Sequence, residues 1–259
     1  MERKSKNIVV LLTDFGASHY TGIMHGVILR YNPYTVVIDL THNITAFSVL
    51  EASFILHTSY KYFPEGSIFI AVVDPGVGTE RSVLITLYNN YTFVAPDNGL
   101  LSPFFKEGET FRFTKFELLG QISSTFHGRD VFAPIGGLLS RGESPHNLGV
   151  REKNPTIIEW WKPQKIDDYT YQGIIIHIDR FGNAITSIPC DHINSISELR
   201  IKNLIIKDKF PSFGYAPFET PFIYCGSSGF LEIALRENNF AKKYNISPLT
   251  PLLCTIPQQ

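Results

Sequence analysis

The sequence predicts an α/β protein, with an N-terminal α/β domain around a mainly parallel central sheet and a smaller C-terminal all-β, barrel-like domain. Two observations favour the first domain. Short, continuous, β-branched apolar runs alternate with segments of helical periodicity, and three of these runs end at an aspartate. A third observation favours the second domain: after about residue 170, short apolar runs follow one another with little helix between them. We place the domains at residues 1–160 and 170–259.

In the first domain, each expected strand is a buried apolar run and each expected helix repeats apolar residues every three or four positions. Asn32-Pro33 and Pro64-Glu65-Gly66 end the first two helices. Asn89-Asn90 predicts a hairpin turn, because asparagine tolerates a positive φ. The expected elements are strand 7–12, helix 20–32, strand 35–40, helix 48–63, strand 67–73, hairpin 82–96 and helix 130–142.

In the second domain, the apolar runs are separated by turn residues and are too short for helices. The segment "NPTIIEWWKPQ" before them is typical of a linker or crossover. The expected strands lie within 173–179, 184–188, 203–209, 221–235 and 251–256.

Composition excludes several classes of protein. With 259 residues and a net charge of −1, the chain can bury a sizeable core but lacks the basic face of a non-specific nucleic-acid binder. The apolar run 8–12 is too short for a signal peptide, and no run approaches a membrane span. Three cysteines without C-x-x-C spacing form no disulfide framework, so we expect a reducing cytoplasm.

Asp14, Asp39 and Asp74 each end an expected strand. In parallel sheets, ligands bind beyond the carboxyl ends of the strands, so at least some of these carboxylates should face a site. Asp14 in "TDFG" suits a ribose diol, or alternatively caps a helix or stabilises a turn.

"DPGVGTER" pairs Asp74 with Arg81 across a glycine turn. The pair is either part of a site or a surface ion pair of little energetic value. In "TFHGRD", His127 is able to titrate near neutrality, whereas Asp130 is expected to be a helix N-cap.

Two motifs of the second domain carry polar groups on turns. In "IDRFGNAITSI", Asp179 and Asn183 either bind a polar ligand, with Phe181 stacking on a flat base, or simply form a β-turn around Gly182. In "YCGSSGFLEIAL", the small-residue loop near Ser227 either lets a ligand approach the backbone or is only a hairpin turn.

Histidines and aspartates near the strand ends raise the question of a metal site. His19, His25, His42 and His57 accompany the three strand-end aspartates, but no H-x-H, D-x-H or H-E-x-x-H spacing occurs. We therefore expect no metal and no cofactor.

Together these blocks resemble the S-adenosyl-L-methionine (SAM) hydroxide adenosyltransferases, the adenosine-forming SAM hydrolases that are related to fluorinase and chlorinase. The resemblance covers nearly the whole chain. It rests on "LLTDFG", "FPEGSIFIAVVDPGVGTERSVL", "FVAPDNGLLS", "TFHGRDVFAP", "IDRFGNAITSI" and "GSSGFLEIA", in this order. It implies hydrolysis of SAM to adenosine and L-methionine by a homotrimer with sites between subunits.

The resemblance also implies site residues. The hydrolases carry an Asp-Arg-His catalytic set, which this sequence matches with Asp74, Arg81 and His127. Fluorinase has a serine where Gly128 stands, so the resemblance favours water over halide as the nucleophile. The implied substrate-binding residues are Asp14 and Phe47 at the ribose, Asp179 at the methionine ammonium, Asn183 at adenine, Phe181 and Tyr215 stacking on adenine, and Ser227.

Three other interpretations stay open at this point. They are a SAM- or adenosine-binding protein without turnover, a SAM-dependent halogenase, and a metal-dependent hydrolase. The first is disfavoured by the intact Asp-Arg-His set and the second by Gly128.

Overall fold

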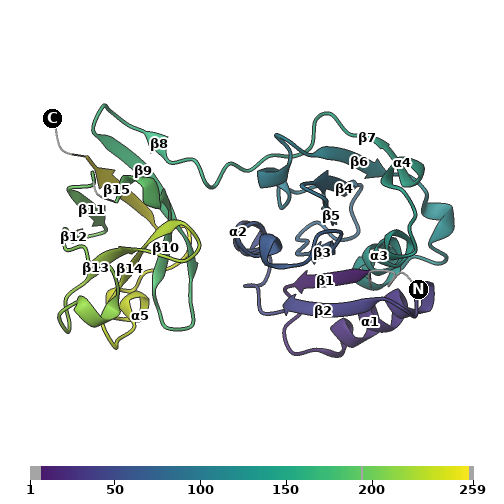
Figure 1. Cartoon of the computed structure of the whole chain (residues 1–259), viewed down its shortest axis with the longest axis horizontal. Coiled ribbons are helices and arrows are strands. Elements are labelled where there is room, and N and C mark those ends of the chain that lie inside the picture. Colours follow the sequence, from purple (N-terminus) through teal and green to yellow (C-terminus); the bar gives the residue numbers. More distant parts are fainter. Residues whose placement is uncertain (1–6, 194, 257–259) are drawn as a thin grey trace, which may run out of the picture. The chain divides into compact units, whose positions relative to one another are not determined.

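The computed structural model describes residues 7–193 and 195–256 and divides the chain into two compact units, Met1–Ile158 and Glu159–Gln259. Figure 1 shows the sheet and helices of the first unit in purple to teal and the strands of the second in green to yellow.

Seven described strands of the first unit form one sheet in the order β2-β1-β3-β5-β4-β6-β7. The pairs β1–β2, β1–β3 and β3–β5 are parallel, and the pairs β4–β5, β4–β6 and β6–β7 are antiparallel. The strands are β1 (Ile8–Thr13), β2 (Val36–Thr41), β3 (Ile68–Val72), β4 (Val83–Tyr88), β5 (Tyr91–Pro96), β6 (Glu109–Phe113) and β7 (Gly149–Arg151).

Helices cover both faces of this sheet (Figure 1). Successive side chains of a strand point to opposite faces. Val9 and Leu11 therefore pack in a core with α1 and α3, whereas Val10 and Leu12 pack in a second core with α2. The helices are α1 (His19–Tyr31), α2 (Val49–Ser59), α3 (Ala133–Ser140) and α4 (Pro145–Leu148). Shorter turns are η1 (Tyr60–Tyr62), η2 (Ser102–Phe104), η3 (Phe116–Leu118) and the π-helical η4 (Gly128–Phe132).

The expected elements of the first unit are present within a few residues of their predicted bounds. In the hairpin of β4 and β5, Asn89 and Asn90 have φ angles of 46° and 63°, as their side chains favour. Strands β6 and β7, which extend the antiparallel half of the sheet, were not predicted.

The second unit is an antiparallel sheet in the order β12-β11-β15-β9-β10-β14-β13, with β8 also pairing with β9. A large apolar core fills it, with a smaller cluster around Phe222, and α5 (Phe240–Tyr244) contributes Phe240 to the large core. The strands are β8 (Gln164–Lys165), β9 (Thr170–Ile178), β10 (Ala184–Pro189), β11 (Glu198–Ile201), β12 (Leu204–Ile206), β13 (Phe222–Cys225), β14 (Phe230–Ala234) and β15 (Pro251–Thr255). The turns are η5 (Cys190–His192) and η6 (Phe213–Tyr215). The predicted fold class, α/β followed by a barrel-like all-β domain, is confirmed.

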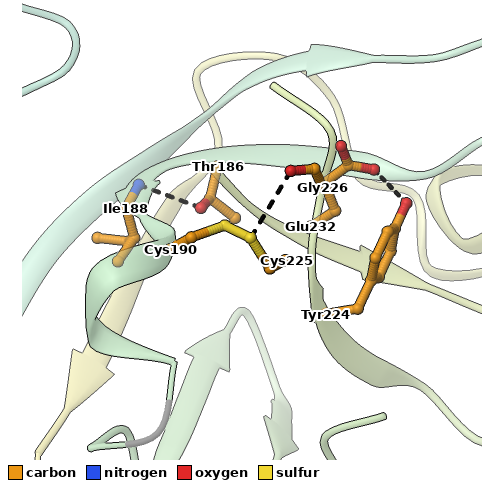
Figure 2. Close-up of a disulfide and its surroundings, with 7 residues drawn as sticks. All are labelled: Thr186, Ile188, Cys190, Tyr224, Cys225, Gly226 and Glu232. Carbon is orange, nitrogen blue, oxygen red and sulfur yellow. Dashed lines mark hydrogen bonds between the residues drawn. A yellow bond between two sulfur atoms is a disulfide. The ribbon is translucent and has the colours of Figure 1, made fainter. Parts of the chain in front are cut away.

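The sequence predicted no disulfide framework, and from this a reducing cytoplasm, but the structure contains one disulfide, so this support for the cytoplasm is lost. Cys190 and Cys225 form a disulfide with a Cα–Cα distance of 5.4 Å, while Cys254 is a free, buried thiol. Figure 2 shows this disulfide between η5 and the end of β13. Sequence spacing did not reveal the pair because 35 residues separate the two cysteines and only the antiparallel sheet brings them together.

None of the helices in the described part of the chain is long and apolar enough to cross a membrane.

Candidate active site

A cavity of about 580 Å³ lies in the first unit, beyond the carboxyl ends of β1 and β3. Four predicted site residues line it: Asp14 follows β1, Phe47 precedes α2, Asp74 follows β3, and His127 precedes η4. The parallel order of β1 and β3 places Asp14 and Asp74 at the same sheet edge, as the strand-end argument predicted.

Arg81 joins Asp74 to His127. Its Nε lies 2.6 Å from Asp74 Oδ2 and its Nη2 also bonds that oxygen, while Nη2 lies 3.1 Å from His127 Nδ1. Only 5% of the Asp74 side chain and 10% of the Arg81 side chain are exposed. The interpretation as a surface ion pair is therefore wrong, and the nearly buried pair of Asp74 and Arg81 forms one connected set with the partly exposed His127.

The turn "DPGVGTER" has the geometry that this contact needs. The N–H of Gly76 donates to Asp74 Oδ1 at 3.2 Å, and the N–H of Val77 donates to the Asp74 carbonyl. Gly78 has a φ of 83°, and a Cβ there would lie 2.8 Å from the Ser124 carbonyl oxygen. The glycine turn thus returns the chain so that Arg81 points back to Asp74.

The protonation state of His127 follows from its partner. A guanidinium has only donors, so His127 Nδ1 accepts from Arg81 and the ring proton of the neutral imidazole is on Nε2. Burial and the positive charge of Arg81 lower the pKa of His127, against the opposing charges of Asp74 and Asp130. Both effects favour a neutral imidazole near neutral pH.

A backbone hydrogen bond from Phe47 positions the carboxylate of Asp14. The backbone N–H of Phe47 donates to Asp14 Oδ2 at 2.9 Å, and Phe47 adopts a φ of 66°. A left-handed conformation is costly for a phenylalanine, and such strain clusters at functional sites. Phe47, which lines the cavity, remains 68% exposed.

An aromatic wall of the cavity was not predicted. The ring centroids of Tyr20 and Phe126 are 4.9 Å apart, and each lies within 6.0 Å of the Phe15 centroid. All three residues line the cavity. They come from the segments "TDFG", "HYTG" and "TFHG", and only their place beside the predicted polar residues could have identified them.

Asp130 is not the helix N-cap that the sequence suggested. It lies inside η4, and its carboxylate accepts from Arg129 at 2.6 and 2.8 Å and from the Ser123 N–H at 2.9 Å. The Arg129 bonds lower the pKa of Asp130, outweighing the effect of burial. Asp130 therefore holds the 123–130 loop, which carries His127.

A second cavity, of about 870 Å³, lies in the second unit. Its lining includes Asp179, Phe181, Asn183 and Ser227, whereas the exposed Tyr215 is not part of that lining.

Asp179 organises the turn that faces this second cavity. Its Oδ1 accepts from the N–H groups of Phe181 and Asn183 at 2.9 Å each, and its Oδ2 accepts from Asn183 Nδ2 at 2.8 Å. Gly182 has a φ of 87°. The expected β-turn is therefore present, and it fixes the same carboxylate and amide that the functional interpretation requires.

Among the residues of this cavity that were not predicted, Tyr224 and Glu232 form a buried polar pair. Tyr224 donates to the Glu232 carboxylate, and both side chains are buried (Figure 2). Burial raises the pKa of Glu232, and the charge of Asp179 raises it further, although the Tyr224 bond opposes the shift. The signal for Glu232 was present in the sequence, since a lone glutamate interrupts the apolar run "GFLEIAL".

Comparison with known proteins finds similarity across both units of the chain. Residues 9–149 match the SAM hydroxide adenosyltransferase N-terminal domain, and residues 173–252 match the corresponding C-terminal domain. The chain is 35% identical to the (R)-S-adenosyl-L-methionine hydrolase of Methanocaldococcus jannaschii, over 94% of each chain.

Two further matches, at lower sequence identity, also cover nearly the whole chain. Fluorinase from Actinopolyspora mzabensis is 24% identical, with 93% of this chain and 95% of fluorinase covered. The crystal structure of an uncharacterized conserved protein from Thermotoga maritima superposes with a TM-score of 0.86 at 31% identity, covering 95% of this chain and 99% of that one.

Proposed function

Because this chain belongs to the SAM hydroxide adenosyltransferase family across both of its units, we propose that it hydrolyses SAM to adenosine and L-methionine. The relative at 35% identity is named for the (R) form of SAM, and we extend that preference to this chain. The observation that carries the proposal is the connected set in which Arg81 bridges Asp74 and His127 beside the cavity.

The reaction is an in-line displacement at the ribose C5′. A water oxygen forms a bond to C5′ as the C5′–S bond breaks, neutral methionine leaves with the bonding pair, and one proton is released. The protein must place one water opposite the C5′–S bond. The fixed positive charge of Arg81 stabilises hydroxide over water, and Asp74 orients the guanidinium.

His127 acts in this scheme as a hydrogen-bond donor. Its Nδ1 lone pair already accepts from Arg81, so only the Nε2–H remains to hold the nucleophilic oxygen. A role as general base would require His127 to break its contact with Arg81. This arrangement supports positioning of hydroxide over proton abstraction by the imidazole.

The other predicted residues hold the substrate in this proposal. Asp14 accepts from the ribose diol, with Phe47 beside the sugar. The turn of the second unit supplies Asp179 for the methionine ammonium and Asn183 for adenine. Phe181 and Tyr215 stack on the base, and Ser227 contacts the substrate. The displacement needs no cofactor, because SAM itself carries the leaving group.

We also propose a homotrimer, with SAM bound between subunits. The proposal is supported by the division of most predicted substrate residues between a cavity of the first unit and a cavity of the second. Sedimentation or light scattering should give three times the mass of the chain. A monomer with full activity would overturn the assembly without affecting the chemistry.

Chromatography of purified protein incubated with SAM tests the function directly. We expect adenosine and methionine in equal amounts, faster from the (R) than from the (S) sulfonium. Arg81→Ala and His127→Ala should abolish adenosine formation but retain SAM binding. His146→Ala, which changes an exposed histidine of the first unit, is the matched control. Binding without turnover in the wild type would favour a sensor, and 5′-halo-5′-deoxyadenosine with added chloride or fluoride would favour a halogenase.

A further inference from the structure

Beside the cavity of the first unit, the fold gathers three side chains with metal-binding atoms. They are His25 on α1, Asp39 on β2 and His42 just after β2. Asp39 Oδ1 lies 2.6 Å from His25 Nε2 and 3.0 Å from His42 Nε2, and the three donor atoms lie within 4.8 Å of one another. We propose that His25, Asp39 and His42 bind a divalent transition-metal ion such as Zn²⁺.

The donor set selects the class of ion. Two imidazole nitrogens and one carboxylate oxygen suit Zn²⁺, Co²⁺ or Fe²⁺, whereas Mg²⁺ and Ca²⁺ prefer oxygen donors. Donor atoms about 2.1 Å from a tetrahedral ion lie about 3.4 Å from one another. The two contacts to Asp39 are therefore slightly tighter than a bound ion requires, and small side-chain rotations open the space. Three protein ligands leave a fourth position for water.

The second observation is the state of His42. Its Nε2 is buried and makes no aligned hydrogen bond, although it faces Asp39. A buried polar atom without a bond needs a physical explanation, and a bound ion is one.

A neighbouring hydroxyl holds the ring of His42 in the orientation a ligand needs. His42 Nδ1 lies 2.9 Å from Oγ1 of the fully buried Thr13. That hydroxyl oxygen also accepts from the Phe15 N–H, so it is placed to accept a second hydrogen bond from His42 Nδ1–H. This tautomer leaves the Nε2 lone pair free for an ion. Metal-binding histidines characteristically have such a partner on the other ring nitrogen.

The site is separate from the proposed hydrolysis but adjoins its scaffold. The carbonyl of His42 accepts from the Gly16 N–H at 2.7 Å, and Gly16 belongs to the loop that carries Asp14. None of the three proposed ligands lines the cavity that contains Asp74 and His127. The ion would therefore brace the loop and take no part in bond breaking.

Metal titration of untagged, chelator-treated protein tests the proposal. We expect one Zn²⁺ per chain by calorimetry, the visible absorption of tetrahedral Co²⁺ on replacement, and a metal-dependent rise in Tm. His25→Ala and His42→Ala should remove all three signals, and Thr13→Val should weaken binding about 10–100-fold. His146→Ala is the control, since His146 lies 3.8 Å from one carboxylate, that of Glu109, and forms no such triad.

Two outcomes would overturn the site. One is wild-type protein that binds neither Zn²⁺ nor Co²⁺ more tightly than the His25→Ala/His42→Ala double variant. The other is binding that survives in this double variant, because the ion would then sit elsewhere. The wild-type titration decides the matter even if a variant fails to fold. Hydrolysis of SAM is measured separately, so failure of this proposal leaves the proposed function intact.

Discussion

The buried pair of Asp74 and Arg81 gives the sharpest prediction, through the substitution Asp74→Asn. Asparagine preserves the size of the side chain but removes its charge. Because only 5% and 10% of the two side chains are exposed, the guanidinium of Arg81 loses its counter-ion in a place where water compensates poorly.

The cost follows from this burial. Breaking a buried ion pair by removing one partner costs about 3–5 kcal/mol. Asp74 borders an open cavity, so the lower end, about 3 kcal/mol, applies. In a unit of this size, such a loss lowers Tm by about 6–12 °C. Misplacement of Arg81 should also lower kcat about 100-fold.

Thermal unfolding and chromatographic detection of adenosine measure the two effects. The double variant Asp74→Asn/Arg81→Met removes the unpaired charge, so it should recover much of the Tm lost by the single variant. Asp168→Asn is the control, because its pair with Lys165 is largely exposed and its loss should leave Tm unchanged. An Asp74→Asn variant as stable as Asp168→Asn, or a double variant less stable than either single variant, would refute the reasoning.

Three further predictions concern pH, the nucleophile and the thiols. Burial and a neighbouring guanidinium lower the pKa of His127, and protonation of this histidine breaks its contact with Arg81. The acid limb of the kcat/KM profile should therefore have its midpoint below the ordinary histidine pKa of about 6.5, and a midpoint above 6.5 counts against the assignment. Gly128→Ser should slow hydrolysis several-fold, because a Cβ there lies 3.1 Å from an aromatic ring carbon, and should still give adenosine as the only product in chloride; faster turnover or a halogenated nucleoside would contradict this expectation. Thiol titration of the unfolded, air-exposed protein should find one thiol, that of Cys254, and three after reduction; three thiols without reductant would exclude the disulfide.

The alternation of strands and helices was predictable because the local spacing of apolar residues indicates each element. Buried runs such as 7–12 and 67–73 carry continuous β-branched residues, and their order fixes a parallel edge with Asp14 and Asp74 side by side. The strand Glu198–Ile201 was missed because four residues with charges at two positions give no clear pattern.

Contacts between side chains that lie far apart in the sequence were not predictable from local periodicity. Asp39 was expected at the ligand edge, but the fold surrounds it with His25 and His42, which come from a helix and a loop at no recognisable motif spacing. The two cysteines of the disulfide likewise meet only through the sheet. Such contacts depend on how elements pack, which a single sequence does not state.

The Cys190–Cys225 bond makes the composition of the buffer part of any stability measurement. The bond spans 35 residues, and closing a loop of that length removes chain entropy worth about 4 kcal/mol from the unfolded second unit. Two laboratories that differ only in whether they add reductant would therefore report different melting temperatures for the same protein. The position of Ser227 two residues after Cys225 means that storage in air or in reductant also sets how firmly one wall of the second cavity is anchored.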